Sequence, residues 1–425
     1  MLVNKYLNAA ERVFVTLSLI VYSSGPLPLL LSSGAGQGID EQDSVAPVDY
    51  TLQQTIFFIN YFISLFLLTI RWKKSIYTLS KEYSIWLLML IALGSIAWSY
   101  SPAVTRARSI ALVGTSLFGL YMSARYSMRE QLRLLGWSFG IIIVLSFIFA
   151  LSNPHYGMMV SGVHSGTWRG IYVHKNVLGK TIGIGGLVFL LLAMDTKTQR
   201  WLPLTGLGLS FCLLLLSKSS SSMINFLTVL ALIPIFQTLR WRYQLMIPTA
   251  IAIVIFGGGL SLWVNENAGM LLGAIGKDPT LTGRTDMWPS ILEMIWKQPW
   301  LGYGYNGFWG DWDSPGSYVW YIVNWTPPNA HNGFLDLWLD FGLVGVIIFG
   351  LGFCQTLMRG LKWVRIDKHW VSFWGVLYLT YLVLGNLTES SLAIRNDLFW
   401  LLYITTAFSL ALTNFAPDEM SAEKS

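Results

Sequence analysis

Long apolar stretches separated by short polar segments run along almost the whole chain of 425 residues. A helix that crosses a bilayer needs about 20 mostly apolar residues, and twelve stretches approach that length. The pattern therefore predicts an all-α polytopic membrane protein with about twelve transmembrane helices. The predicted spans are 13–31, 52–70, 83–98, 109–124, 134–151, 177–194, 201–217, 222–239, 245–264, 333–358, 370–387 and 397–414.

The first apolar stretch has a second interpretation. Lys5 and Arg12 precede it, as basic residues precede the apolar part of a secretory signal peptide. Against this, the stretch is long, contains Pro26 and Pro28, and lacks a clear A-x-A cleavage motif. We expect it to be retained as the first transmembrane helix.

Composition narrows the class of protein further. Charged residues make up 12% of the chain, against about 25% in an ordinary soluble domain. Hydrophobic residues make up 54%, and the mean hydropathy is +0.53. These values exclude a soluble globular enzyme, a disordered protein and a nucleic-acid-binding domain, so the net charge of +6 does not indicate a nucleic-acid partner.

The distribution of basic residues predicts the orientation of the spans. With the N-terminus in the cytoplasm, inside segments hold 18 of the 28 Lys and Arg residues, whereas the first outer loop, 32–50, has acidic residues and no basic one. Basic residues favour cytoplasmic loops, so both termini are expected to be cytoplasmic. The remaining basic residues, expected at the outer side, are Arg106, Arg108, Arg169, Lys175, Lys180, Lys218, Lys277, Arg284, Lys297 and Arg395.

Two outer segments are much longer than the other connections, and long loops tend to be functional. We expect residues 1–264 to form nine transmembrane helices with a periplasmic loop at 152–176. Residues 265–332 should form a large periplasmic loop with short amphipathic helices. One of these is expected at 290–299, where Ser290 and Glu293 have the spacing of a capping box. The last three helices follow over 333–414, and 415–425 should be a cytoplasmic tail.

The outer side also contains the residues most suited to chemistry. Arg169 and Arg284 lie in the two long loops, and each could bind a phosphate in a bidentate way. A headgroup anchor or a surface ion pair is the more ordinary explanation of a single outer Arg, but two of them, one in each long loop, fit either interpretation. His331 directly precedes the tenth span, followed by Asn332. A histidine there can act as a general base near neutral pH, or it can simply cap the helix.

Aromatic residues are dense in the large loop, and Tyr305 and Trp309 are among them. Such rings can stack on sugars, but they also form ordinary interfacial belts, and density alone does not separate the two. The sequence has no H-E-x-x-H, no Cys/His cluster and no D-x-D for a metal, and no Walker motif for a nucleotide. We therefore expect no metal or other cofactor.

Several motifs resemble one known family. His331 and Asn332 begin the pattern H-N-x9-G-x-x-G, which ends at Gly345 and is similar to the signature of the O-antigen ligase and polymerase superfamily. Four further segments resemble its ExoQ-like exopolysaccharide polymerase branch. These are W-R-G-I-Y-V-H-K-N-V-L-G (168–179), L-T-G-R-T-D-M-W (281–288), Q-P-W-L-G-Y-G-Y-N-G-F-W (298–309) and N-L-T-E-S-S-L (386–392). The S-K-S run at 217–219 matches a place where the family often has S-R-S or S-R-T.

The resemblance implies a GT-C-type glycosyltransferase at the periplasmic face of a bacterial inner membrane. Its donor would be a glycan linked through a diphosphate to undecaprenol, and its acceptor a sugar hydroxyl. In the implied inverting displacement, His331 accepts the acceptor proton, while Arg284 and Arg169 stabilise the departing diphosphate. His174 and Lys175 are secondary substrate-binding candidates, together with Trp309 and Tyr305, and Asn332 either orients His331 or caps its helix. Chain-length control in such systems usually involves partner proteins.

Three functions stay open. The ExoQ-like motifs favour a polymerase, whose acceptor is another lipid-linked repeat unit. A ligase would instead transfer the glycan to lipid A-core. A flippase for the same lipid-linked glycans is less expected, because transporters place polar groups at mid-membrane and often have paired repeats. Here the polar outliers gather at the outer ends of the spans.

Overall fold

The computed structural model describes residues 2–32, 49–160, 164–196, 198–242, 244–249 and 284–413, and of residues 2–5 and 284–286 the backbone alone. Within these ranges the protein is all-helical, as predicted, apart from one antiparallel bridge between Met158 and Trp168. The α-helices are α1 (Leu2–Tyr22), α2 (Leu27–Leu31), α3 (Thr51–Ile70), α4 (Trp72–Leu79), α5 (Tyr83–Gly94), α6 (Pro102–Arg125), α7 (Met128–Ser152), α8 (Pro154–Gly157), α9 (Lys175–Asp195), α10 (Trp201–Leu216), α11 (Ser220–Gln237), α14 (Arg284–Lys297), α15 (Ser317–Val323), α16 (Gly333–Ile366), α17 (Trp374–Asn386) and α18 (Leu398–Leu412).

Among the described residues, five helical segments are long and apolar enough to cross a membrane, which makes this a membrane protein by length and composition. They are Thr51–Ile70, Met128–Ser152, Lys175–Asp195, Ser220–Arg240 and Gly333–Ile366. A sixth candidate is the pair α4 and α5, which is bent by 89°. The helical segments Trp201–Leu216, Trp370–Asn386 and Leu398–Leu412 are apolar but shorter. The predicted total of twelve spans stays a prediction, because most of the stretch 245–264 lies outside the described residues.

Several helix boundaries differ from the predicted ones. The predicted first span, 13–31, is divided between α1 and α2, and α6 and α7 begin several residues before their predicted starts. Two further differences lie close to the candidate site. The helix α16 continues to Ile366, although its apolar stretch was predicted to end at 358, because hydropathy reports the membrane-compatible length and not the end of helical hydrogen bonding. The helix predicted at 290–299 begins at Arg284 instead. The capping role expected for Ser290 is therefore wrong, and its hydroxyl donates to the carbonyl of Met287 (2.7 Å) inside the helix.

Two hydrophobic clusters hold the helices together. The main core is dominated by large aromatic side chains from α17 and α18, including Trp374, Tyr378 and Trp400, which are almost fully buried. A smaller cluster packs α14 and α15 against the start of α16, and Ile291 and Ile295 belong to it, as the expected apolar face requires. The described part of the large outer segment is thus a packed layer fixed to α16.

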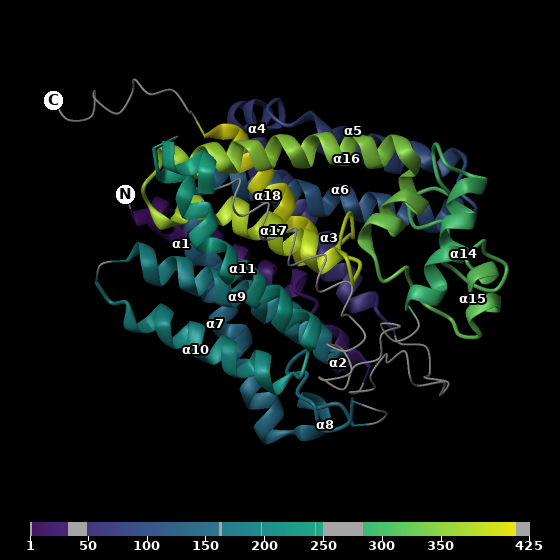
Figure 1. The fold of residues 1–425 in the computed structure, drawn as a ribbon, viewed down its shortest axis with the longest axis horizontal. Coiled ribbons are helices and arrows are strands. Elements are labelled where there is room, and N and C mark those ends of the chain that lie inside the picture. The colour runs from purple at the N-terminus through teal and green to yellow at the C-terminus, as the bar shows by residue number, and fades with distance from the viewer. Residues whose placement is uncertain are drawn as a thin grey trace.

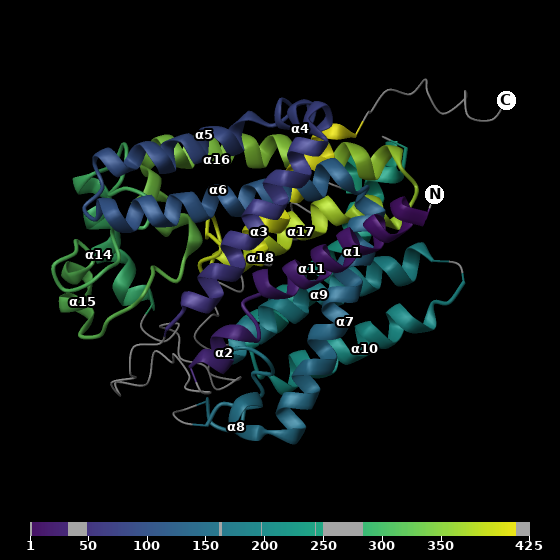
Figure 2. The ribbon, with the colours of Figure 1, turned by 180° about the vertical axis from the view of Figure 1, so that it is seen from behind.

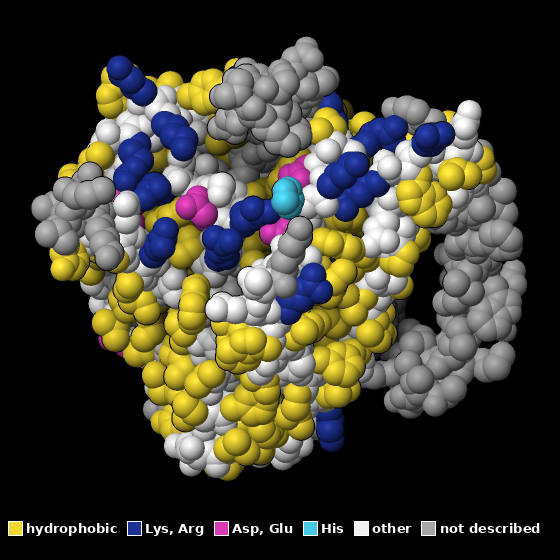
Figure 3. Space-filling model, turned by 90° about the vertical axis from the view of Figure 1, so that its left-hand side faces the viewer, with side chains coloured by type: hydrophobic (Ala, Val, Ile, Leu, Met, Phe, Trp, Pro, Cys, Tyr) yellow, Lys and Arg dark blue, Asp and Glu magenta, His cyan; other side chains and the backbone are white. Residues whose placement is uncertain are grey.

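The helices run side by side with α14 and α15 at one end of the bundle (Figures 1 and 2). The start of α1 and the end of α18 lie at the opposite end. Figure 3 shows that this opposite end carries many Lys and Arg side chains above a largely hydrophobic surface. It is the end that the charge pattern assigns to the cytoplasm.

Candidate functional site

His331 lies in the turn between α15 and α16. Its φ of +49° falls in the left-handed region, which is uncommon for a residue other than glycine. Its backbone N–H donates to Oδ1 of Asn329 (2.9 Å). The next residue, Asn332, accepts from the backbone N–H groups of Phe334 (3.0 Å) and Leu335 (3.3 Å), so it caps α16. Of the two roles left open for Asn332, the described hydrogen bonds give it the cap.

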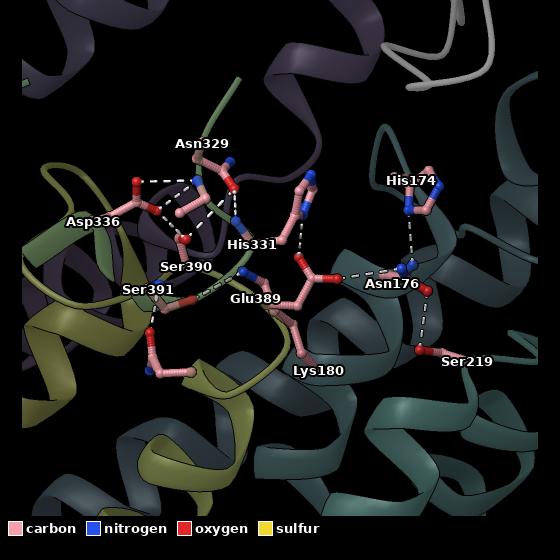
Figure 4. A network of polar contacts seen from close by, with 12 residues as sticks. His174, Asn176, Lys180, Ser219, Asn329, His331, Asp336, Glu389, Ser390 and Ser391 are labelled. Carbon is pink, nitrogen blue, oxygen red and sulfur yellow. Dashed lines mark hydrogen bonds and ion pairs between the residues drawn. The ribbon is translucent and has the colours of Figure 1, made fainter. Parts of the chain in front are cut away.

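The imidazole of His331 is buried beside Glu389. Only 4% of His331 is exposed, and neither ring nitrogen has a hydrogen-bond partner among the described residues. Nδ1 lies 4.0 Å from the nearer carboxylate oxygen of Glu389, as Figure 4 shows. Such distances often shorten when substrate binds. A carboxylate at Nδ1 would hold the ring in one tautomer and leave Nε2 able to accept a proton.

The carboxylate of Asp336 fixes the turn that carries His331. Its two oxygens accept from the backbone N–H of Ala330 (3.1 Å each), the residue directly before His331. One oxygen also accepts from Nε1 of Trp309 (2.8 Å), and the other accepts from the hydroxyl of Ser390. Asp336 therefore connects α16 with the 298–309 segment and with the connection between α17 and α18.

The helix α16 is broken at the point where the 298–309 segment packs against it. At Gly342 the backbone leaves the helical conformation, with φ +65°. The N–H groups of Leu343 and Val344 then donate to the carbonyls of Pro299 (2.7 Å) and Trp300 (3.2 Å) instead of to α16 itself. A Cβ at Gly342 would lie 2.1 Å from the Trp300 carbonyl oxygen. This position needs glycine because of both the positive φ and the close approach of a second backbone.

The first turns of α14 lie next to the same site. Trp288 donates from Nε1 to the carbonyl oxygen of Ala330 (3.0 Å), beside His331. Arg284 is the first residue of α14, one helical turn before Trp288. The structure thus brings the start of this helix to the His331 turn, while the side chain of Arg284 lies outside the described residues.

The opposite wall of the site comes from α9 and from the break between α10 and α11. Asn176 donates to the second carboxylate oxygen of Glu389 (3.4 Å) and accepts from the hydroxyl of Ser219 (3.1 Å). Lys180, one turn further along α9, donates to the hydroxyl of Ser391 (3.2 Å). These residues line a small cavity of about 20 Å³, large enough for about one water molecule. Among the described residues, no three His, Cys, Asp or Glu side chains are grouped to hold a metal ion.

His174 and Lys175 support this wall. His174 caps α9, and its Nδ1 accepts from the backbone N–H of Asn176 (3.2 Å). Lys175 is 8% exposed, and its ammonium group lies 3.5 Å from the carbonyl oxygen of Lys218 in the S-K-S break. These contacts join the start of α9 to the start of α11.

Arg169 is fully buried, and its guanidinium binds backbone carbonyl groups of its own loop. It donates to the carbonyls of Tyr156 (3.0 Å), His155 (2.9 Å) and Val173 (3.3 Å). Sequence reasoning expected this guanidinium to face a diphosphate. The described contacts hold this guanidinium against the loop that leads into α9, and its contact with a diphosphate stays a prediction.

The two aromatic candidates differ in accessibility. Tyr305 is fully buried, donates to the carbonyl of Ala393 (2.7 Å) and packs 5.4 Å from the ring of Phe341. Its expected sugar-binding role has no support in this packing, because neither ring face is accessible. Trp309 is partly exposed, and its indole N–H is fixed by Asp336.

Sequence reasoning assigned no role to Asp336, Glu389 or Lys180. Asp336 and Lys180 are charged residues inside predicted spans, and such residues are functional candidates by default, so this signal was present. Glu389 stood in a recognised motif, but its partners Asn176 and His331 are far away in the sequence and come together only in the fold.

Comparison with known proteins finds two similarities. Residues 205–350 match the O-antigen ligase family, and this range includes both the S-K-S break and the turn of His331. The chain is also 27% identical over 282 residues to a protein described as exopolysaccharide production protein ExoQ from Rhizobium meliloti (strain 1021). That match covers 63% of this chain and 62% of the relative's length. These similarities confirm the resemblance of this membrane protein to the O-antigen ligase family and its ExoQ-like branch.

Proposed function

We propose that this protein is a GT-C-type glycosyltransferase that polymerises undecaprenyl-diphosphate-linked repeat units into a surface polysaccharide. It acts at the periplasmic face of a bacterial inner membrane, with twelve spans and cytoplasmic termini. The observation that carries the proposal is the buried imidazole of His331, with a carboxylate near one ring nitrogen and no described partner for the other. The site lies at the end of the bundle opposite the basic end.

The reaction is a single inverting displacement without a metal. The acceptor hydroxyl oxygen attacks the anomeric carbon of the donor glycan, and Nε2 of His331 takes the hydroxyl proton. The bond between the anomeric carbon and the diphosphate oxygen breaks, and its electron pair leaves with undecaprenyl diphosphate. Glu389 stabilises the imidazolium that forms.

Basic residues around the site fit the anionic leaving group. Arg284 begins the helix whose Trp288 contacts the residue beside His331. We therefore assign to Arg284 the role of stabilising the negative charge on the departing diphosphate. Lys180 and Lys175 supply further positive charge from α9. Arg169 acts indirectly, by holding the loop before His174, and the partly exposed ring of Trp309 is a surface for a sugar.

The second candidate is an O-antigen ligase, favoured by the family description that matches residues 205–350. The similarity to a protein named for exopolysaccharide production favours the polymerase. Both reactions use the same donor and differ only in the acceptor.

A reconstituted assay separates these functions. Purified protein in proteoliposomes is incubated with lipid-linked repeat units without nucleotide, with and without lipid A-core, and the products are resolved on a gel. A ladder of products from repeat units alone supports the polymerase. Transfer only to lipid A-core identifies a ligase, and movement of the lipid across vesicles without a covalent product identifies a flippase.

Replacing Glu389 with glutamine is expected to lower kcat about tenfold to a hundredfold, because a unit charge 4 Å away contributes up to about 4 kcal/mol at an effective dielectric of 20, before solvent screening. KM for lipid-linked repeat units should stay within about twofold. Initial rates over a range of substrate concentrations measure both constants. As a control, Glu293→Gln removes an exposed carboxylate that pairs with Lys297 on α14 (3.3 Å) and should change neither constant. A higher KM at unchanged kcat would show that Glu389 binds substrate instead of assisting His331.

A further inference from the structure

A second cavity lies beside the candidate site, at the same end of the bundle. It has a volume of about 760 Å³ and is open to the surface between the starts of α3 and α6 and the residues Ile394 to Asn396. The connection between α17 and α18 joins the two sites. Glu389 near its beginning faces His331, and Arg395 near its end lines the second cavity.

Three arginines line this cavity, and none of them forms an ion pair with a carboxylate of the described residues. Arg108 and Arg395 both donate to the single side-chain oxygen of Asn306 (3.3 and 3.0 Å). Arg106 has no hydrogen bond or ion pair within the described part of the chain. Two guanidinium groups that share one neutral oxygen repel each other, so the arrangement favours an anion that accepts from both.

The carboxylate of Asp340 belongs to the same network and already accepts two hydrogen bonds from Asn306. Asp340 accepts from the backbone N–H (2.9 Å) and the side-chain amide (3.1 Å) of Asn306, which therefore stands between Asp340 and the two guanidinium groups. The N–H groups of Asn306 thus donate to the carboxylate of Asp340, and its side-chain oxygen accepts from Arg108 and Arg395. This arrangement holds Arg108 and Arg395 in place while leaving their remaining N–H groups available for a ligand.

Part of the cavity wall is apolar and exposed, beside polar residues that include Gln53, Gln54 and Asn396. Phe58 on α3 is 51% exposed, and Val104 and Ile110 on α6 are 38% and 46% exposed. Because α3 is a candidate membrane span, these side chains offer a path for a hydrocarbon tail beside the bilayer. A cationic end joined to an apolar outer wall suits an amphiphile with an anionic headgroup.

We propose that this cavity binds the diphosphate of the lipid-linked acceptor, and so acts as a second lipid-diphosphate site next to the donor site. The inference rests on the proposed polymerase function, because a polymerase must hold two lipid-linked glycans at once whereas a ligase needs one lipid diphosphate. Three arginines match the several negative charges of a diphosphate better than those of a phosphodiester headgroup.

A steric variant tests the site without removing an arginine. Ala107 is exposed on α6 and lines the cavity, so the indole of Ala107→Trp should obstruct the space beside Arg106 and Arg108. Ala103 is exposed on the same helix and lies outside the cavity lining, so Ala103→Trp is the matched control. In native mass spectrometry of the full-length protein, we expect wild type and Ala103→Trp to bind two equivalents of undecaprenyl diphosphate. Ala107→Trp should bind one.

Competing ligands identify the headgroup. Neither a tenfold excess of phosphatidylglycerol nor the same excess of inorganic diphosphate should displace the second equivalent, since the proposed ligand needs both a diphosphate and a tail. Arg395→Gln should weaken binding of the second equivalent of undecaprenyl diphosphate at least tenfold. The proposal is overturned if wild type binds only one equivalent, if Ala107→Trp still binds two, or if phosphatidylglycerol competes as well as undecaprenyl diphosphate.

An acceptor without lipid or phosphate tests whether the second cavity binds the acceptor. A labelled oligosaccharide repeat without lipid or phosphate can act only as an acceptor, with unlabelled lipid-linked repeats as donor. Ala107→Trp should lower polymerisation of lipid-linked repeats at least tenfold and leave transfer to the free oligosaccharide within twofold of wild type. Equal losses in both reactions would overturn the acceptor assignment. Absence of product from the wild-type protein would instead contradict the polymerase function itself.

Discussion

Replacing His331 with asparagine is expected to lower the rate of polymer formation about 10²–10⁴-fold, the usual contribution of a general base. Asparagine has no basic nitrogen, and it tolerates the left-handed backbone that His331 adopts at φ +49°, so the change should leave the turn intact. Binding of undecaprenyl diphosphate should stay close to wild type. Initial rates of the purified variant with lipid-linked repeats, together with its thermal unfolding, measure these effects.

His369→Asn is the matched control for this experiment. His369 lies after α16 with its side chain 65% exposed, 3.6 Å from the carboxylate of Asp195, so its loss should not change the rate. If His331→Asn retained a rate near that of wild type, His331 would not be the base. The inverting displacement would then need another proton acceptor.

Replacing Gly342 with alanine is expected to destabilise the packing of the large outer segment and to abolish most of the activity. A non-glycine residue at φ +65° costs about 1–3 kcal/mol, and the added Cβ would also lie 2.1 Å from the carbonyl oxygen of Trp300. Relief of that clash would displace the 298–309 segment, which includes Trp309. Thermal unfolding in detergent and the rate of proteolysis within 298–316 measure this displacement.

Gly350→Ala provides the comparison on the same helix. A Cβ built at Gly350 meets no atom within 4 Å outside the backbone of its own helix and its chain neighbours, so this variant should change stability by less than about 0.5 kcal/mol. Equal behaviour of the two variants would show that the 298–309 segment does not depend on the break in α16.

Much of the helical architecture could be predicted from hydropathy, because an apolar stretch bounded by polar residues forms its hydrogen bonds locally. The predicted spans 52–70 and 177–194 agree closely with α3 and α9. Details that depend on neighbours were missed. The start of α14 moved because Met287 packs in the second cluster and Trp288 binds a carbonyl beside His331, so the helix is stabilised before the predicted cap at Ser290.

Side-chain roles were harder to predict than helices. Arg169 and Tyr305 were chosen because their residue types suit a diphosphate and a sugar, yet both are fully buried and bound to backbone carbonyl groups. Residue type indicates what a side chain can bind. Whether backbone groups of the same protein already occupy it depends on how the loops close.

The order of apolar stretches, the placement of basic residues and the motif around His331 were enough to indicate a membrane-embedded helical protein and the family that it resembles. These features are local, because each depends on residues that lie within about twenty positions of one another in the sequence. Two other features are not local: the pairing of His331 with Glu389, and the proximity of Arg106, Arg108 and Arg395. They arise from the connections between helices that are far apart in the chain, and only the packing of those helices brings their charges within contact distance.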